Sequence, residues 1–329
     1  MVEISVVVPA YNAERTINKT VEALLSQKIE RSYEIIVIDD GSTDATQEIL
    51  RKYPIKLISQ KNAGPSAARN VGWKAASGEI VAFTDSDCVP VPGWLEALSK
   101  HFEDSSVGGV GGTYKTENPE SILAAYIAED IRFRQRGLRR EIEGTGTCYA
   151  AYRKKLLEKV GGFDENYRKA TAEDFDLCFA IRKTGHKIIY EPEAVVGHYH
   201  KESFLKYLKS QFWHAVSRVY LYSKYKNMAK GDQYTPLYVL MQVPISLLFL
   251  ASFVPAFFVG GMFVVPVIFM SVLVALTVPF VRYEMRRNPL IAVVGVFMQL
   301  VRNIVWAVGF LCGLGNLVYM RFKNAKRME

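Results

Sequence analysis

Hydrophobic and polar positions divide the chain into an N-terminal part of short alternating segments and a C-terminal part of long apolar ones. In the N-terminal part, short apolar runs predict strands at 4–8, 34–38, 55–59 and 80–84. Apolar residues at helical spacing predict helices at 17–25, from Gly41-Ser42 to Leu50, and at 66–76. Because this alternation is typical of a mostly parallel sheet with helices on both faces, we expect an α/β fold.

Beyond Gly112 the pattern is less regular. A helix-like stretch at 121–140 is rich in arginine: Arg132, Arg134, Arg136, Arg139 and Arg140. A helix at about 173–183 and a strand at 187–190 follow. Residues 203–225 combine aromatic and basic side chains, which suits a helix lying among lipid headgroups. The alternative is a helix that covers the soluble domain and has one solvent-exposed face.

The C-terminal part begins with a long run that lacks any charged residue. This run, Gln233 to Val281, is 49 residues long. Since one membrane crossing needs about 20 apolar residues, the run predicts two crossings joined by a turn at 255–261. The chemistry of the N-terminal part is therefore expected to take place at a bilayer surface.

A third apolar segment, Pro289 to Met320, contains one charge, Arg302, next to Asn303. An ionisable residue at mid-span is costly in lipid, so it should face protein or water. A third crossing would place the basic tail 321–327 outside, against the positive-inside tendency. The segment therefore either re-enters and returns or crosses against that tendency. Gly309 and Gly313 form a GxxxG pair that could pack helices closely, within one chain or in a homo-oligomer.

Charge and cysteine content narrow the class of protein. The net charge is +8, and the residues from Pro236 onward carry eight Lys/Arg against two Asp/Glu. The excess charge therefore flanks the membrane segments, which argues against nucleic acid as a partner. Four cysteines without CxxC spacing indicate neither a zinc site nor a disulfide framework. The N-terminus lacks the features of a signal peptide, so we expect the catalytic part to be cytoplasmic.

Acidic residues follow two of the predicted strands, at the edge where parallel sheets bind their ligands. Asp85 and Asp87 follow the fourth strand and, two residues apart, point to the same side in an extended backbone. Two such carboxylates can share a hard divalent cation, which brings phosphates with it. Asp39 and Asp40 precede a Gly-Ser turn, where one aspartate suffices for capping and the other can accept hydrogen bonds from a base or ribose.

These motifs, in this order, resemble those of the family 2 glycosyltransferases with the GT-A fold. The resemblance covers roughly residues 1–200. It rests on the following stretches: 9–12 (PAYN), 39–44 (DDGSTD), 64–70 (GPSAARN), 85–87 (DSD), 161–165 (GGFDE) and 173–177 (EDFDL).

The resemblance implies a role for each matching residue. The residues that would hold the nucleotide sugar are Pro9, Tyr11, Asp39, Arg69, Asp85 and Ser86. Asp39 would accept from the base, Arg69 would lie over the base or diphosphate, and Asp85 would face the ribose. Asp87 would bind Mg²⁺ or Mn²⁺ directly. His198 resembles a third metal ligand, with His200 as an equal competitor.

The resemblance also implies an inverting mechanism with Asp174 as the catalytic base. Inverting transfer is one in-line displacement, in which a carboxylate takes the proton of the acceptor hydroxyl and a metal ion stabilises the departing diphosphate. Glu173, Arg132 and Arg136 are candidates for the acceptor side. The expected activity is that of a hexosyltransferase using a UDP- or GDP-linked sugar.

The acceptor and the class of protein leave alternatives. The membrane segments and Asp174 favour a hydroxyl on a lipid-linked, glycolipid or polysaccharide acceptor. A polyprenyl phosphate is the alternative, and it needs no base because it is already an anion. A nucleotidyltransferase should carry a glycine-rich loop after its first strand. A processive synthase needs more crossings, and Gln211-Phe212-Trp213 only loosely matches its QxxRW motif. A non-catalytic membrane scaffold would not need the intact acidic motifs.

These expectations divide the chain into three parts. Residues 1–200 form the catalytic domain, with a nucleotide-binding half at 1–115 and an acceptor half at 116–200. Interfacial helices occupy 201–232, and the transmembrane region occupies 233–329. We expect a multi-pass protein of the cell membrane.

Overall fold

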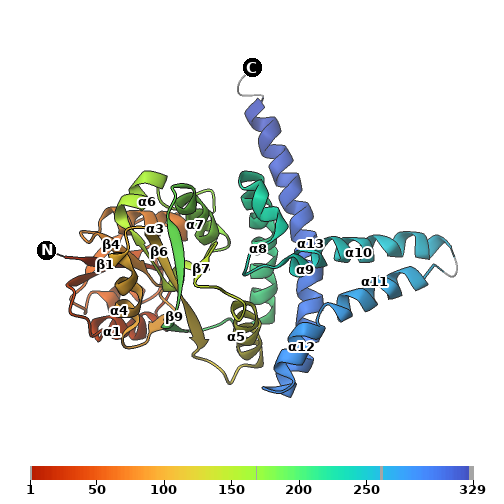
Figure 1. The fold of residues 1–329 in the computed structure, drawn as a ribbon, viewed down its shortest axis with the longest axis horizontal. Coiled ribbons are helices and arrows are strands. Elements are labelled where there is room, and N and C mark those ends of the chain that lie inside the picture. Colours follow the sequence, from red (N-terminus) through yellow and green to blue (C-terminus); the bar gives the residue numbers. More distant parts are fainter. Residues whose placement is uncertain (1, 168, 260–261, 326–329) are drawn as a thin grey trace. The chain divides into compact units, whose positions relative to one another are not determined.

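The computed structural model describes residues 2–167, 169–259 and 262–325, with side chains up to residue 319 except that of residue 229. The chain forms two compact units (Figure 1). The sheet unit comprises Met1–Asn118 and Leu138–His200, and the helical unit comprises Pro119–Gly137 and Lys201–Glu329.

The sheet unit contains a nine-stranded mixed sheet with the strand order β3-β2-β1-β4-β8-β6-β9-β5, and β7 also pairs with β9. Its parallel half confirms the four strands predicted from the sequence: β1 (Ile4–Ala10), β2 (Tyr33–Asp39), β3 (Lys56–Ser59) and β4 (Ile80–Phe83). In the other half, β8 is antiparallel to β4 and β6, while β6 and β9 are parallel.

Several strands of the second half were not predicted. They are β5 (Cys88–Pro90), β6 (Val107–Thr116), β7 (Glu141–Ile142) and β8 (Ala150–Arg153). The predicted strand at 187–190 is the start of the longer β9 (Lys187–His198). Strand β6 contains four glycines, so its sequence lacks the apolar pattern that predicts a strand. These positions are glycine because neighbouring atoms leave no room for a side chain. A Cβ on Gly112 would lie 1.9 Å from the carbonyl oxygen of Ala194.

Helices cover both faces of the sheet, as predicted. One face packs against α1 (Ile17–Leu25), α2 (Thr46–Leu50) and α4 (Trp94–Ser99), and the other against α3 (Pro65–Lys74), α6 (Lys154–Val160) and α7 (Glu173–Lys183). Strand β1 shows the alternation: Val6 and Val8 lie in one core, and Val7 lies in the other. Short 3-10 turns occur at Lys100–Glu103 and Thr147–Tyr149.

The helical unit consists of α5 (Ile122–Gln135), α8 (Phe204–Lys224), a 3-10 turn (Lys226–Lys230), α9 (Leu237–Leu240), α10 (Gln242–Phe258), α11 (Val264–Ala275), α12 (Val278–Glu284) and α13 (Pro289–Ala325). Three segments are long and apolar enough to cross a membrane: Leu237–Phe258, Val264–Glu284 and Pro289–Tyr319. The first two correspond to the predicted pair of crossings. Helix α10 runs through Pro255 to Phe258, so the connection starts later than predicted, and Gly260 and Gly261 lie outside the described residues.

Helix α5 differs from its prediction in length and in place. It ends at Gln135, not at 140, and it belongs to the helical unit although we had placed it in the acceptor half at 116–200. The reason is its apolar face. Tyr126 and Phe133 are buried and pack with Phe280, Ile291 and Met298 of α12 and α13.

Candidate functional site

The loops that follow β1 and β2 are tied together by hydrogen bonds. The Asn12 side-chain oxygen accepts from the Thr43 amide at 2.8 Å, and the Asn12 amide donates to Ser42 Oγ at 3.0 Å. Asn12 adopts a positive φ of 49°, which fixes the direction of the turn. Next to it, Tyr11 is 51% exposed, while Pro9 remains half-buried in β1. The loop therefore presents the Tyr11 ring on a backbone of fixed shape.

Asp39 and Asp40 are both buried and both hold the local backbone. The Asp39 carboxylate accepts from the Ser42 amide at 3.1 Å and from Gln47 Nε2 at 3.2 Å. Asp40 accepts from the amides of Ala63 and Gly64, both at 2.9 Å. We expected one aspartate to cap the turn and the other to be available to a ligand, but both accept hydrogen bonds from the protein. Asp39 still has lone pairs for a ligand, because a carboxylate can accept about four hydrogen bonds.

Arg69 links the end of β4 to the start of α7. Its guanidinium donates to Asp85 Oδ1 and to Glu173 Oε1, both at 2.8 Å. Burial disfavours the charged form of this side chain, but the two carboxylates outweigh that effect and raise the Arg69 pKa. The second Glu173 oxygen accepts from the Thr171 amide at 2.6 Å. Arg69 and Glu173 are thus buried residues that join two parts of the candidate site.

Asp87 and His198 come together although they are far apart in sequence. His198 Nε2 lies 3.7 Å from Asp87 Oδ1, and the Asp87 side chain is 45% exposed. Cys88 completes a group whose candidate ligand atoms all lie within 4.8 Å of one another. Burial raises the pKa of the Cys88 thiol well above its ordinary value, and a thiolate suits soft metals better than Mg²⁺ or Mn²⁺. Asp87 and His198 remain as the fitting donors for a divalent cation.

His200 supports His198 in the same strand region. The two Nδ1 atoms lie 3.0 Å apart, which leaves His198 Nε2 on the side of Asp87. Tyr114 stacks on the His198 ring with a centroid separation of 5.5 Å. His200 is buried, whereas His198 is half-buried. The geometry therefore favours His198 over His200 as the group that faces a cation.

The remaining expected residues occupy different surroundings. Ser86 is half-buried, and its carbonyl accepts from Thr20 Oγ1 at 3.1 Å. Asp174 is half-buried in the first turn of α7, where its carboxylate accepts from the Phe175 amide at 2.8 Å. Arg132 and Arg136 belong to the helical unit. There Arg132 pairs with Glu129, and the Arg136 guanidinium lies 3.7 Å from the centre of the Phe133 ring.

Sequence reasoning missed a lysine near these groups. Lys19 Nζ donates to Tyr199 Oη at 2.7 Å, and this hydrogen bond raises the Lys19 pKa. The backbone amide of Tyr199 in turn donates a hydrogen bond to the carbonyl oxygen of Asp87 at 3.1 Å. The sequence around Lys19 could not predict this contact, because its partner Tyr199 lies 180 residues away along the chain.

Comparisons with known proteins point in one direction. The family model described as "Glycosyl transferase family 2" matches residues 5–161. Glycosyltransferase AglE of Haloferax volcanii is 30% identical over 228 residues, which cover 64% of this chain and 70% of that protein. Pre-mycofactocin glycosyltransferase of Mycobacterium tuberculosis is 31% identical over 210 residues, which cover 60% of this chain and 43% of that protein. The chain thus spans less than half the length of this relative.

A solved structure shows the same fold. The mannosyltransferase PcManGT from Pyrobaculum calidifontis, in complex with GDP-Man and Mn²⁺, superposes with a TM-score of 0.63. The alignment covers 94% of this chain and 87% of that chain, with 20% sequence identity. Together with the mixed sheet and its covering helices, this likeness identifies a GT-A fold.

Proposed function

Because the chain belongs to the family 2 glycosyltransferases, we propose that it transfers a sugar from a nucleotide sugar, with inversion, to a hydroxyl of a lipid-linked or other membrane acceptor. The reaction requires Mg²⁺ or Mn²⁺ and takes place at the cytoplasmic face of a membrane. A polyprenyl phosphate is the alternative acceptor.

The observation that carries this proposal is the bridge from Asp85 through Arg69 to Glu173. It holds the Asp85–Asp87 motif and the first turn of α7 in one arrangement. Asp87 lies two residues beyond Asp85, and Asp174 lies directly after Glu173. One buried guanidinium therefore fixes the distance between the expected phosphate site and the expected base.

Asp174 is suited to take a proton from an acceptor. It is half-buried at the start of α7, so part of its carboxylate is accessible to a ligand. The amide of Phe175 holds one oxygen at 2.8 Å, which orients the group. In the proposed reaction Asp174 removes the hydroxyl proton as the acceptor oxygen attacks the anomeric carbon, and the bond to the diphosphate breaks on the opposite face.

Asp87 and His198 would hold the divalent cation, with phosphate oxygens and water as its other ligands. The bound ion supplies positive charge against the departing diphosphate. This assignment is supported by the accessible Asp87 carboxylate, by the ring orientation that His200 and Tyr114 impose on His198, and by the Mn²⁺ bound in PcManGT.

Tyr11, Pro9 and Asp39 form the proposed base site at the ends of β1 and β2. The exposed Tyr11 ring offers a flat apolar face, and Asp39 offers lone pairs to a base N–H. The donor of PcManGT is GDP-linked, which supports a nucleoside diphosphate sugar here. Glu173, once a candidate for the acceptor side, instead acts by positioning α7.

Substitution of Asp174 by Asn tests the proposal because it keeps shape but removes the proton acceptor. We expect turnover on a hydroxyl acceptor to fall by about 10²–10⁴-fold, the usual contribution of a general base. Donor affinity, measured by calorimetry with Mn²⁺, should barely change. The exposed Asp104→Asn, at the turn before β6, serves as the matched control and should behave as wild type.

The same variant distinguishes the two acceptor classes. On a polyprenyl phosphate, the attacking oxygen is already ionised, so Asp174→Asn should matter far less. Near wild-type turnover on every acceptor would show that Asp174 is not the base. It would favour a polyprenyl phosphate as the acceptor. Full activity of wild type in excess chelator would contradict the cation requirement.

A further inference from the structure

Helix α13 is apolar enough to cross a membrane, yet its N-terminal half packs against a charged helix. Arg302 of α13 donates to both carboxylate oxygens of Asp130 on α5, at 2.8 and 3.0 Å. Both side chains are buried. Within its 14 residues α5 carries four charged side chains, Glu129, Asp130, Arg132 and Arg134. The first half of α13 therefore lies against a helix with ionisable groups on several sides.

The C-terminal half of α13 packs against a second charged helix, α8. A Cβ on Gly309 would lie 2.7 Å from the carbonyl oxygen of Phe212, and one on Gly313 would lie 2.9 Å from that of Val216. Trp306 Nε1 also donates to Gln211 Oε1 of α8 at 3.0 Å. The two helices thus approach to backbone contact over more than one turn, and the glycine pair noted in the sequence packs within the chain.

The charges of α8 are spread along its whole length. Its four cations are Lys206, Lys209, Arg218 and Lys224. With 21 residues the helix is about 31 Å long, as long as the hydrocarbon core of a bilayer is thick. If α8 stood upright in the membrane, Lys206 and Lys224 would lie near its ends, but Lys209 and Arg218 would lie at hydrocarbon depth, where ionisable groups are strongly disfavoured. Helix α8 must therefore lie at the surface, and α13, in close contact with it, lies there too.

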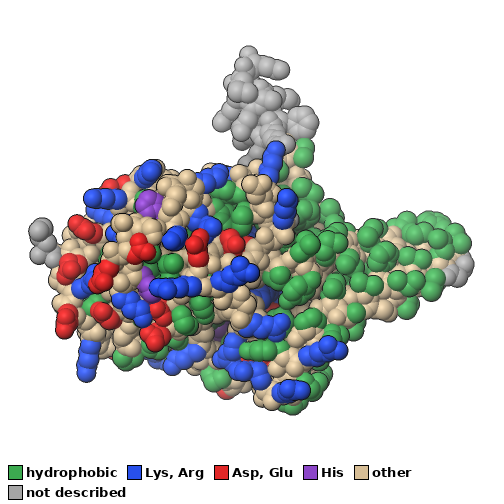
Figure 2. All heavy atoms as spheres, viewed as in Figure 1, with side chains coloured by type: hydrophobic (Ala, Val, Ile, Leu, Met, Phe, Trp, Pro, Cys, Tyr) green, Lys and Arg blue, Asp and Glu red, His purple; other side chains and the backbone are tan. Residues whose placement is uncertain are grey.

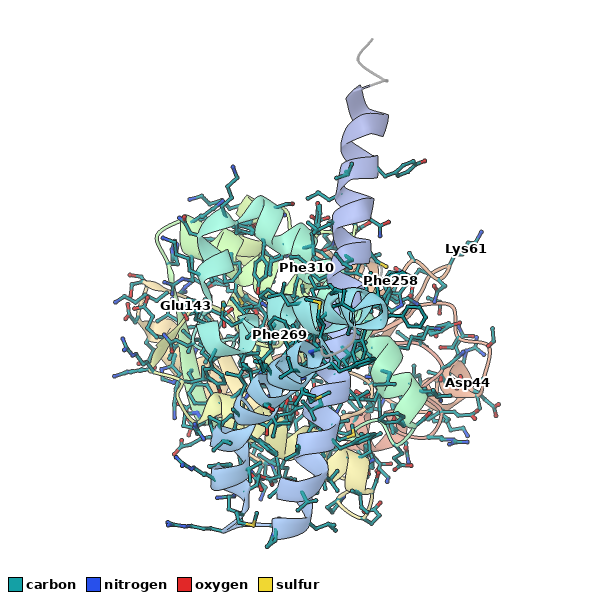
Figure 3. All side chains as sticks on the ribbon, turned by 90° about the vertical axis from the view of Figure 1, so that its right-hand side faces the viewer. Asp44, Lys61, Glu143, Phe258, Phe269 and Phe310 are labelled. Atoms are coloured by element: carbon teal, nitrogen blue, oxygen red, sulfur yellow. The ribbon has the colours of Figure 1, made fainter. Side chains whose placement is uncertain are left out.

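The hairpin of α10 and α11 has the opposite character. No residue between Asp232 and Arg282 is charged, and large apolar side chains are exposed around the hairpin, with Phe257 81% exposed. Figure 2 shows this arm covered by hydrophobic side chains. The hairpin leaves α13 crosswise in Figure 1, and Figure 3, turned by 90°, shows it end-on in front of the upright α13. A bilayer that contains the hairpin upright therefore has α13 lying in its plane.

The exposed surface of α13 fits an interfacial position. Exposed apolar residues gather on one face of the helix, which includes Leu290, Val293, Val308, Leu311 and Val318. Gly309 and Gly313, which contact α8, lie on the opposite face. In Figure 1 α8 and the hairpin lie on opposite sides of α13. Near Gly309 and Gly313 the exposed face is turned away from α8, whereas nearer the start of α13 Phe297 stacks on Phe204 of α8.

We infer that the α10–α11 hairpin is the membrane-inserted element and that α13 is not a third crossing. Helix α13 lies along the interface, with its exposed face in the boundary between headgroups and acyl chains of the bilayer. Because a hairpin enters and returns, the C-terminus lies on the same side of the membrane as the sheet unit. The basic tail 321–327, whose side chains lie outside the described residues, then satisfies the positive-inside tendency.

Depth measurements along α13 test this inference. Single cysteines at Val293, Val308 and Val318 would carry spin labels in the full chain with Cys312→Ser, reconstituted in liposomes of phosphatidylcholine and phosphatidylglycerol. Collisions with oxygen and with a polar nickel complex report depth. We expect one shallow depth at all three sites and a different, deeper value at Leu250 of the hairpin. The parent Cys312→Ser chain should take up little label, since Cys88 and Cys178 are buried and Cys148 is half-buried.

A crossing α13 would give a different profile. Val293 and Val318 are 25 residues apart, about 38 Å along a helix, so they would emerge on opposite sides with Val308 near the bilayer centre. That profile would overturn the inference. The exposed native Cys312, labelled in the unaltered chain, gives a fourth depth without any substitution. Protease protection of a C-terminal tag gives a second test: the tag should be cleaved from the same side as an N-terminal tag, and cleavage from opposite sides would refute the proposal.

Discussion

At the scale of single residues, Arg69 joins Asp85 to Glu173 inside the sheet unit. The sequence resemblance placed it over the donor, whereas the structure places it inside the protein between Asp85 and Glu173. Its planar guanidinium can bind two carboxylates at once, in a fixed geometry that an ammonium group does not reproduce. We therefore propose Arg69 as a positioning residue, whose loss should affect both stability and the alignment of Asp174 with the donor.

Arg69→Lys should keep the charge but lose this geometry. Removal of one partner from a buried ion pair costs about 3–5 kcal/mol, and Lys should approach that cost because it leaves one carboxylate without a partner. We expect a lower unfolding free energy in denaturant and a reduced kcat, with a smaller change in donor affinity. The double change Arg69→Met with Glu173→Met should recover stability without recovering kcat. Wild-type kcat in Arg69→Lys would contradict the positioning role.

The two histidines of β9 and its end allow a second prediction. His198→Ala should raise the Mn²⁺ concentration needed for half-maximal activity, because it removes a proposed ligand. His200→Phe should raise it less, since this side chain supports the ring of His198 and partners of metal ligands typically contribute about 10–100-fold in affinity. Titration of activity with Mn²⁺ ranks the two variants. The reverse ranking would assign the ligand role to His200.

At the scale of elements, a strand or helix could be predicted where its own residues show a clear hydrophobic pattern. Strands β1 to β4 were predicted because each contains a short, mostly apolar run, and these runs alternate with segments of helical spacing. Strand β6 was not predicted, because its sequence VGGVGGTYKT has no such run. Its glycines pack against Tyr152, Thr145 and Ala194, and these contacts become visible only in the folded structure. Likewise, Asp39, Asp85 and Asp87 could be predicted at the sheet edge, whereas the Arg69–Glu173 contact spans 104 residues and leaves no local pattern.

Close packing of α8 and α13 gives a prediction with a built-in control. Gly309→Ala should destabilise the chain by about 1–3 kcal/mol, the usual cost of overpacking, because its Cβ meets a backbone carbonyl of α8. Gly315→Ala, on the same helix but with no atom within 4 Å of its Cβ, should instead stabilise by up to about 1 kcal/mol through helix propensity. Thermal unfolding in detergent compares the two. Equal effects would show that the helices are not in close contact.

At the scale of the whole molecule, the two units differ in the medium that they require. The sheet unit has a core that is closed on both faces of its sheet, whereas the hairpin of the helical unit exposes apolar side chains throughout. The basic segment 282–287 ends the hairpin, and short basic segments are retained in the cytoplasm.

This arrangement predicts the accessibility of the segment 282–287. Met285 is exposed, so a cysteine at this position should react with a membrane-impermeant maleimide in broken cells but not from outside intact cells. Native Cys312 gives a background that Cys312→Ser removes. Efficient labelling from outside would place this segment, and with it the base of the hairpin, on the external side.

The return of the hairpin to the side where it entered also bears on transport. Two helices that lie side by side cannot enclose a passage for a sugar, and the hairpin carries no charged group that could guide one through the lipid. If the acceptor is a lipid, as proposed, the synthetic step would therefore be non-vectorial, and the glycosylated lipid would remain in the leaflet that faces the donor. Delivery to the opposite leaflet would then require a separate translocase with its own source of energy.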